Sequence, residues 1–182
     1  MYSRAEGALV AAGNPTQYHY KQSELTEIVN KLGYKVVLWT TVDAKDWKNP
    51  GAENIANTII NNAKNYVYIQ TPYLVPDSPM LEAIKISALS GVDVRIIVPG
   101  EPDHFFMEWM LSANIGLLIE YGVKIYRYGK GFIHSKTIIA DGEVCSIGTA
   151  NLDIRSFKLN FEVNALIYSE EFAKKQEEIF LE

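Results

Sequence analysis

Apolar and polar residues follow two different periods along this chain. Apolar side chains recur at helical spacing in three segments, which we predict as helices: Asn54 to Asn65, Met80 to Ser90 and Phe106 to Tyr121. A short apolar or β-branched run follows each helix, and we predict these runs as strands: Tyr66 to Gln70, Asp93 to Val98 and Val123 to Tyr128. Helices that alternate with strands are typical of an α/β fold.

From residue 129 onwards, the predicted strands follow one another without helices between them. They cover Phe132 to Ala140, Glu143 to Gly148 and Phe161 to Tyr168, and a charged helix from Glu170 ends the chain. Strands in succession, added to the alternating ones, predict a mixed β-sheet flanked by helices.

The amino-terminal third has a weaker pattern. Ser23 to Leu32 has helical spacing and Lys35 to Val42 resembles a strand, so we expect an N-terminal αβ extension of the fold. Residues 1 to about 20 fit neither period because Gly13 and Pro15 interrupt them, and no element is predicted there.

The composition is that of a folded chain. Of 182 residues, 48% are hydrophobic and 21% charged, which suits one ordinary domain or a small domain with an extra segment. No apolar run approaches the roughly 18 to 20 residues of a membrane span, and no basic segment precedes the apolar stretch from Gly7 to Gly13. We therefore expect neither a span nor a secretion signal, and any membrane contact should be peripheral. The single cysteine, Cys145, excludes an internal disulfide and a thiolate zinc cluster.

Charge is unevenly distributed along the chain. The whole sequence carries −5, which disfavours a nucleic-acid module that works by bulk electrostatics. Residues 121 to 164 nevertheless hold six Lys and Arg against four Asp and Glu, so this stretch carries +2 and the remainder −7. A cationic stretch in an acidic chain predicts an anionic ligand there, and a chance excess of two charges is the alternative.

The segment FIHSKTIIAD, from Phe132 to Asp141, carries the strongest chemical signal. In a strand, His134 and Lys136 project from the same face. A neutral imidazole can attack phosphorus while a fixed ammonium stabilises the charged oxygens, so the pair suits phosphoryl chemistry. Asp141 directly precedes Gly142, and Asp-Gly favours a tight hairpin turn, so the direct role of Asp141 is predicted to be structural.

A loop of small residues follows the next predicted strand. The residues from Gly148 to Asn151 offer amides, a hydroxyl and a carboxamide that can line an anion pocket. Glu162, in another predicted strand, can accept a hydrogen bond from the second ring nitrogen of His134 and so fix its tautomer. A surface carboxylate is the plainer interpretation of Glu162.

These strings resemble the phospholipase D superfamily. HSKTIIAD has the His-x-Lys-x4-Asp form of that superfamily, and GTANLDIRS and NFEVN resemble its usual continuation. Upstream, YVYIQTPYLVPD, GVDVRIIVPG and GVKIYRY resemble the second catalytic half of bacterial cardiolipin synthases. The resemblance covers about residues 66 to 182 and implies a phospholipase D-like half-domain.

The resemblance implies a two-step displacement at a phosphodiester, without a metal or another cofactor. His134 would be the nucleophile that forms a phosphohistidine, and a second histidine would protonate the leaving alcohol. Lys136 and Asn151 would hold the phosphoryl oxygens, and Glu162 would orient His134. Asp141 completes the catalytic motif of the family.

Three further residues are candidate substrate contacts. Thr149 is a weaker candidate for holding the phosphoryl oxygens. Ser156 either braces the loop or contacts the substrate, and His104 is a candidate for the pocket rim, with an exposed loop histidine as the alternative.

The implied substrate is a phospholipid. In cardiolipin synthases the donor is phosphatidylglycerol, a second phosphatidylglycerol accepts the phosphatidyl group, and glycerol is released. The resemblance therefore implies a phosphatidylglycerol-like substrate and a peripheral location at the cytoplasmic face of the cell membrane, and nucleic acid is not expected as a partner.

The sequence holds one motif where the family's site needs two that face each other. The nearest second match is His19 to Lys21, but Thr26 stands where the aspartate is required and no Gly-Thr-x-Asn loop follows. A complete site would require a homodimer, as the single-motif nucleases of the superfamily build by isologous pairing. A homodimeric nuclease-type phosphodiesterase is accordingly an alternative function.

The amino-terminal third resembles a different family. KLGYKVVLWTTVDAKDWKNPGAENIANTIINNAKN is similar to the late part of a NodB-type polysaccharide deacetylase, but the metal-binding motifs of that family do not occur, so deacetylase chemistry is not expected. We predict a deacetylase-like segment at residues 1–65 and a catalytic half-domain at 66–182, with residues 50 to 65 fitting either parent. A catalytically incomplete chimeric fragment is the remaining alternative.

Overall fold

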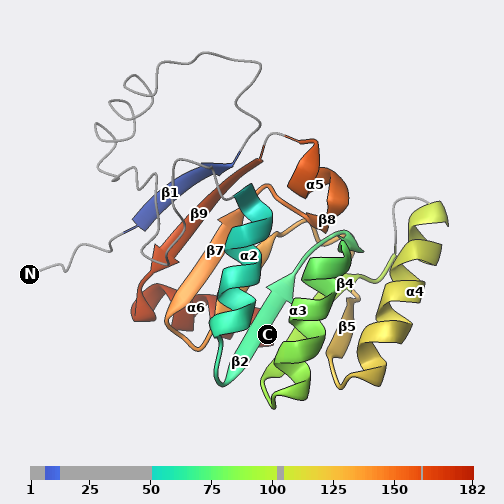
Figure 1. The fold of residues 1–182 in the computed structure, drawn as a ribbon, viewed down its shortest axis with the longest axis horizontal. Helices are drawn as coiled ribbons and strands as arrows, with labels where there is room; N and C mark the ends of the chain where they lie inside the picture. The colour runs from blue at the N-terminus through green and yellow to red at the C-terminus, as the bar shows by residue number, and fades with distance from the viewer. Residues whose placement is uncertain (1–6, 13–50, 102–104, 161) are drawn as a thin grey trace, which may run out of the picture.

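A mixed β-sheet organises the computed structural model, which describes residues 7–12, 51–101, 105–160 and 162–182. In these residues seven strands lie side by side in the order β1-β9-β7-β6-β2-β4-β5 (Figure 1). The strands of this sheet are β1 (Gly7–Ala12), β2 (Tyr66–Gln70), β4 (Asp93–Pro99), β5 (Lys124–Tyr128), β6 (Thr137–Ala140), β7 (Val144–Gly148) and β9 (Glu162–Tyr168). Two short strands, β3 (Leu74–Val75) and β8 (Leu152–Asp153), form a separate parallel pair.

Helices cover both faces of the sheet. They are α2 (Gly51–Asn62), α3 (Ser78–Leu89), α4 (Phe105–Glu120), the short α5 (Ile154–Lys158) and α6 (Glu170–Leu181). Figure 1 shows α2 and α3 in front of the sheet and α6 behind it. None of the helices described is long and apolar enough to cross a bilayer.

The main core lies between the sheet and the layer of α2, α3 and α4. Ile60, Ile84 and Leu118, one from each helix, are fully buried against strand residues such as Val67 and Ile96. Burial of this kind supplies most of the stability of the fold, at about 1.5 to 3 kcal/mol for each large aliphatic side chain. Because α2 shares this core with β2 and β4, it packs as part of the same unit as the residues after 66.

A smaller core lies under α6 on the opposite face. Ile139 and Cys145 project from β6 and β7 into this layer, and the rings of Tyr68 and Phe180 stack with centroids 4.7 Å apart. Burial raises the pKa of the Cys145 thiol to about 12, so this cysteine is a packed core thiol rather than a nucleophile.

Strand direction changes in the middle of the sheet. β2, β4 and β5 run parallel, whereas β6 is antiparallel to β2 and the pairs β6–β7, β7–β9 and β9–β1 are antiparallel as well. The predicted mixed sheet flanked by helices is confirmed.

The Asp-Gly hairpin turn between β6 and β7 is also confirmed. Asp141 and Gly142 both have positive φ, 53° and 66°, and the Glu143 N–H donates to the Ala140 carbonyl over 3.0 Å. Asp and Gly tolerate this backbone region better than most residues do, which is why the dipeptide marks the turn in the sequence.

One predicted strand is wrong at its start. The run from Phe132 to Ala140 is a strand only from Thr137, because β2 ends at Gln70, opposite Thr137, and β7 ends one residue beyond Ile147. Residues 132 to 136 extend past both neighbours and have no ladder to join. His134 and Lys136 therefore lie in a loop.

Few of the predictions for the amino-terminal third fall on residues that the structure describes. β1 occupies Gly7–Ala12, where no element was predicted, and pairs with β9 from Gly7 opposite Ile167 to Ala12 opposite Glu162. The predicted helix at 23–32 and strand at 35–42 lie outside the described residues.

Candidate active site

Six strand ends lie together at one end of the sheet, which we call the sheet edge of the candidate site. The carboxyl ends of the parallel strands β2, β4 and β5 lie there, and Gln70 at the end of β2 pairs with Thr137 at the start of β6. Because β7 and β9 run antiparallel, the end of β7 and the start of β9 reach the same edge, where Gly148 pairs with Asn164. Loops that leave such an edge are where open α/β sheets bind ligands.

His134 lies in the loop that leads into β6 at this edge. Its side chain is exposed, and its ring centroid is 5.9 Å from that of Phe132, with 32° between the ring planes. Phe132 in turn lies 6.4 Å from the ring of Tyr73. Aromatic rings therefore lie on one side of the imidazole, which itself remains accessible from solvent.

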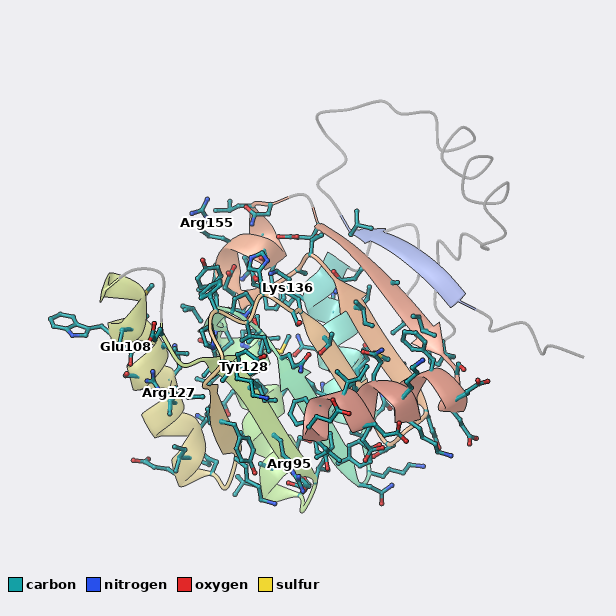
Figure 2. All side chains as sticks on the ribbon, turned by 180° about the vertical axis from the view of Figure 1, so that it is seen from behind. Arg95, Glu108, Arg127, Tyr128, Lys136 and Arg155 are labelled. Carbon is teal, nitrogen blue, oxygen red and sulfur yellow. The ribbon has the colours of Figure 1, made fainter. Side chains whose placement is uncertain are left out.

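Lys136 lies beside His134 and contacts its backbone. The Lys136 Nζ donates to the His134 carbonyl oxygen over 2.7 Å. Burial lowers the pKa of Lys136, and the carboxylates of Glu162 and Asp153 oppose that shift. A half-buried ammonium between these groups is a fixed positive charge for an anionic ligand. In Figure 2, Lys136 lies at the end of the sheet that carries α5, and Arg95 lies at the opposite end.

The loop after β7 is held against Lys136. The Gly148 N–H donates to the Lys136 carbonyl over 3.2 Å, and the Thr149 N–H donates to the Val163 carbonyl over 3.0 Å. A side chain at position 148 would overlap the Val163 carbonyl and Asn164, so only glycine allows β7 and β9 to approach this closely. The predicted small-residue loop thus lies at the candidate site.

Glu162 has partners other than the predicted one. It is buried, and its carboxylate accepts from the Thr149 hydroxyl and, over 3.2 Å, from the Asn160 side-chain amide. The predicted bond from the His134 ring is not among these contacts, and the orienting role of Glu162 stays a prediction. Glu162 acts on the site by holding Thr149 and by its charge near Lys136.

Asn151 and Ser156 hold each other in place. The Ser156 hydroxyl oxygen lies 3.1 Å from the Asn151 backbone nitrogen and 3.3 Å from its Nδ2. Asp153 caps α5 by accepting from the Ser156 N–H over 2.6 Å, which fixes Ser156. The Oδ1 atom of Asn151 is buried and has no hydrogen-bond partner within the structure. A buried polar atom of this kind is expected at a site that completes its hydrogen bonds with a ligand.

Asp141 lies at the opposite edge of the sheet from His134. Its carboxylate accepts from the backbone N–H groups of Lys64, Asn65 and Tyr66 over 2.7, 2.8 and 2.9 Å. Burial alone would raise the pKa of Asp141, but these backbone donors outweigh it and hold the pKa below its ordinary value. Asp141 thus joins β2 to the β6–β7 turn, which is a structural role, and its place among the catalytic residues stays a prediction.

His104 lies outside the described residues. The described residues likewise include no group of three or more His, Cys, Asp or Glu arranged to hold a metal ion. A hollow between α2 and the β6–β7 turn, lined by residues such as Asn62, Asp141 and Tyr168, contains none of the side chains around His134.

Two buried residues, which the sequence analysis did not single out, hold the loops around the site in place. The Thr71 Oγ1 donates to the Tyr73 carbonyl over 2.9 Å and accepts from the Leu152 N–H over 3.2 Å, which ties the residue after β2 to the start of β8. Asp77 caps α3 and pairs over 2.8 Å with Lys158 of α5. Burial raises the pKa of Asp77, but the Lys158 ammonium and the Met80 N–H outweigh it, so the carboxylate stays charged.

Of these two residues, only the capping role of Asp77 could be predicted from the sequence. Asp followed within two residues by Pro79 marks the start of a helix. Thr71 belongs to a contact between residues 81 positions apart, and no local pattern reports such a contact.

The comparisons with known proteins show the family and the fold. The family described as "Cardiolipin synthase, PLD-like domain" matches residues 57–182. The chain belongs to this family. The match includes the second half of α2, in agreement with the packing of that helix in the main core.

The similar sequences are cardiolipin synthases of much greater length. The chain is 61% identical over 122 residues to that of Clostridium perfringens (strain SM101) and 55% identical over 124 residues to that of Listeria monocytogenes (strain HCC23). These alignments cover 67% and 68% of this chain but 26% of each relative. The chain thus spans about a quarter of the length of the curated relatives it matches.

Solved structures share the fold. Nuc of Salmonella typhimurium, a phospholipase D family member, superposes with a TM-score of 0.62 at 19% identity over 70% of this chain and 82% of its own. NucT of Helicobacter pylori gives 0.60 at 25% identity over 70% of this chain and 84% of its own. Both likenesses extend over most of a shorter protein.

Proposed function

We propose that this chain carries a phospholipase D-type phosphatidyltransferase half-site in which His134 is the nucleophile. One observation carries the proposal: an exposed imidazole, a half-buried ammonium and an unpartnered carboxamide oxygen meet at one sheet edge, on His134, Lys136 and Asn151. The family match over residues 57–182, which include this edge, and the high identity to cardiolipin synthases support a phosphatidylglycerol-like donor.

The first chemical step forms a bond from an imidazole nitrogen of His134 to phosphorus. The bond from phosphorus to the leaving glycerol oxygen breaks, and that oxygen receives a proton from a second histidine. Lys136 stabilises the charge on the non-bridging oxygens, and it does so more strongly because it is partly withdrawn from water. Asn151, in the loop after β7, supplies a further contact to those oxygens through its side-chain NH2 group. Thr149, whose hydroxyl donates to Glu162, holds that loop in place.

The second step reverses the first with a new alcohol. A hydroxyl oxygen of the acceptor lipid forms a bond to phosphorus and gives its proton to the second histidine. The bond between phosphorus and His134 breaks, and the free imidazole is restored. No net oxidation or reduction occurs, so the chain needs only the two alcohols and the two histidines.

The second histidine must come from outside the motif that contains His134. The sequence has one His-x-Lys-x4-Asp motif, and the near-match from His19 lies outside the described residues. We propose that a second copy of the chain supplies the missing histidine in a homodimer. The exposure of His134 at the sheet edge leaves room for such pairing.

A labelled lipid tests the proposal directly. Incubation with phosphatidylglycerol that carries a labelled phosphate should give cardiolipin and an acid-labile label on His134. His134→Ala should abolish both, whereas His19→Ala is the matched control and should retain both. Absence of product and of labelled protein at high protein concentration would refute the proposed activity.

A homodimeric phosphodiesterase is the second candidate, favoured by one observation. The fold is shared with Nuc and NucT over 82% and 84% of those chains, with TM-scores of 0.62 and 0.60. Hydrolysis of a small phosphodiester, confined to the dimer and without transfer to a lipid alcohol, would favour this candidate. The net charge of −5 weakens nucleic acid as its substrate.

The third candidate is a catalytically incomplete chimeric fragment. The resemblance of about residues 20 to 65 to a deacetylase supports a fusion, although most of that stretch lies outside the described residues. This candidate predicts a monomer in which His134→Ala changes no measurable rate.

We also propose a peripheral location at the cytoplasmic face of the membrane, where a phospholipid substrate is found. The chain would then need a surface that holds the sheet edge of His134 against a bilayer.

A further inference from the structure

Every backbone N–H group from residue 148 to 152, between the end of β7 and the start of β8, donates to an acceptor within the protein. The Gly148 and Thr149 N–H groups donate to backbone carbonyls. The next three donate to side-chain oxygens from three separate parts of the fold. These bonds join Ala150 to the Asn164 Oδ1, Asn151 to the Ser156 Oγ and Leu152 to the Thr71 Oγ1, over 3.2, 3.1 and 3.2 Å.

This arrangement limits what the loop after β7 offers to a substrate. Its N–H groups are not available to line the predicted anion pocket, because each already has an acceptor. The Thr149 hydroxyl is engaged as well, since it donates to Glu162. The polar group that remains is the Asn151 carboxamide, whose Oδ1 has no hydrogen-bond partner among the described residues. The contact of this loop with a phosphoryl group therefore depends on how Asn151 is held.

Asn164, in β9, is the buried side chain that holds the loop just before Asn151. A backbone N–H can only donate, so the side-chain oxygen of Asn164 must face Ala150. The Asn164 Nδ2 then donates to the Ser146 hydroxyl over 3.2 Å. Asn164 is 9% exposed and Ser146 is 2% exposed, so water does not compete for these bonds. A buried amide that is bonded at both ends has one orientation.

Close packing restrains the same carboxamide. Gly148 pairs with Asn164 in the ladder between β7 and β9. A side-chain carbon at position 148 would overlap the Asn164 Oδ1, so the carboxamide occupies the space that the glycine leaves free. Glycine at 148 thus lets the Asn164 oxygen reach the Ala150 N–H.

The hold on Ala150 matters because Asn151 is the next residue. Small residues such as Gly148 and Ala150 have little side-chain packing to restrain them, and without its bonds the loop would sample many conformations. A dipole that is already oriented stabilises the charge that develops in a transition state, whereas a dipole that must first reorient stabilises it less. A fixed loop therefore makes the Asn151 carboxamide more effective than a mobile loop would.

We propose that Asn164 is a positioning residue, which binds the Ala150 N–H and so aims the Asn151 carboxamide at the transferred phosphoryl group. The inference rests on the proposed function, because that function gives Asn151 its contact with the phosphoryl oxygens. Asn164 is buried and acts through the backbone of its neighbour.

A purely structural role is the alternative, since any buried hydrogen bond can stabilise the fold. The two ends of the Asn164 amide allow the roles to be separated. Its oxygen binds the loop at Ala150, whereas its nitrogen binds Ser146 inside β7. A positioning role requires the first bond, and a structural role draws on both.

Three substitutions in the full chain make this separation. Asn164→Leu has nearly the same shape and removes both bonds, whereas Ser146→Ala removes only the bond inside β7. For Asn164→Leu we expect phosphatidyl transfer to slow about 10- to 100-fold with KM nearly unchanged, because a small displacement of a catalytic group costs a factor of this order. Ser146→Ala should lose stability in urea but keep most of the rate.

Asn164→Asp is the conservative variant, because it keeps the oxygen acceptor for Ala150. Its carboxylate would lie on the same strand face as the buried Glu162, so recovery should be partial. The rate of Asn164→Asp should therefore fall between those of Asn164→Leu and the wild-type chain.

Amide hydrogen exchange reports the hold on the loop without any turnover. The Ala150 N–H should be protected in the wild-type chain and in Asn164→Asp, and should exchange at least about tenfold faster in Asn164→Leu. The wild-type measurement needs no variant, so it applies even if Asn164→Leu does not fold.

Three outcomes would overturn the positioning role. They are equal losses of rate and stability in Asn164→Leu and Ser146→Ala, a rate of Asn164→Asp no higher than that of Asn164→Leu, and an unprotected Ala150 N–H in the wild-type chain. A protected Ala150 N–H together with a failure to label His134 in the wild-type chain would uphold the hold on the loop while refuting the proposed chemistry.

Discussion

The Ser156 hydroxyl oxygen lies 3.1 Å from the Asn151 backbone nitrogen and 3.3 Å from the Asn151 side-chain nitrogen. A hydroxyl both donates and accepts, so Ser156 can hold the carboxamide in either orientation. If the carboxamide turns by 180°, Ser156 donates to its oxygen and the NH2 group takes the unpartnered position, where it can donate to a phosphoryl oxygen. We therefore propose Ser156 as a positioning residue that would act on a substrate through Asn151.

Removal of this hydroxyl should slow the reaction more than it weakens the fold. For Ser156→Ala we expect the rate of phosphatidyl transfer to fall about tenfold, with KM nearly unchanged, because Asn151 loses its orientation in the transition state. Ser156→Thr keeps a hydroxyl and should recover part of the rate, and Ser90→Ala, at the exposed end of α3, is the control. Equal loss of rate and of stability would instead assign Ser156 a purely structural role.

The rate of phosphatidyl transfer should decline at a lower pH than the titration of an unperturbed lysine would cause. Burial lowers the pKa of Lys136, so its ammonium is lost below the usual value of about 10.4, and the rate should fall with it. Lys136→Arg keeps the charge at high pH and should move this decline upward, at a lower maximal rate. The pH profile of phosphatidyl transfer measures the shift, and identical alkaline limbs in the two proteins would contradict it.

A methyl group at position 148 should disrupt the junction of β7 and β9. Gly148→Ala places a side chain on the Val163 carbonyl and Asn164, and such overpacking costs about 1 to 3 kcal/mol. Gly116→Ala on α4 is the matched control, because its added carbon meets nothing within 4 Å and alanine favours a helix by about 1 kcal/mol. Urea unfolding of both variants gives the comparison, and an unchanged midpoint for Gly148→Ala would disprove the close approach.

Asp141 should matter for stability and leave the chemistry intact. Asp141→Asn keeps a residue that tolerates positive φ but weakens the acceptors for three backbone N–H groups, so we expect a loss of about 1 to 3 kcal/mol. The rate of the folded protein should remain. Glu143→Gln, an exposed carboxylate in the same turn, is the control.

The same substitution should flatten the response of stability to acid. Because the folded pKa of Asp141 is lowered, its contribution is present above the unfolded pKa of about 3.9 and is lost as pH falls through the folded pKa. Unfolding measured between pH 6 and pH 3 should show a steeper loss for the wild-type chain than for Asp141→Asn. Parallel curves would rule out this role of Asp141.

Local patterns predicted much of the described fold. The spacing of apolar residues placed α3 and α4 to within a few residues, and Asp141 with Gly142 marked the β6–β7 turn. These features depend on the period and backbone preferences of neighbouring residues, which the sequence displays directly. The string from His134 to Asn151 predicted a strand that contains His134 and Lys136 and a small-residue loop after the next strand. The structure confirms the two paired strands, β6 and β7, but places His134 and Lys136 in the loop before β6.

The order of residues by itself thus determined the alternation of helices and strands, the turn, and the family. Only the packed sheet decided that His134 lies beyond the end of β6, that Glu162 binds Thr149 across two strands, and that Thr71 holds Leu152 from 81 positions away. The physical reason is that a strand extends only as far as its neighbours offer ladder partners, and a buried polar group takes whichever partner the fold brings within reach. Both depend on contacts between distant segments, which form only when the chain has closed its core.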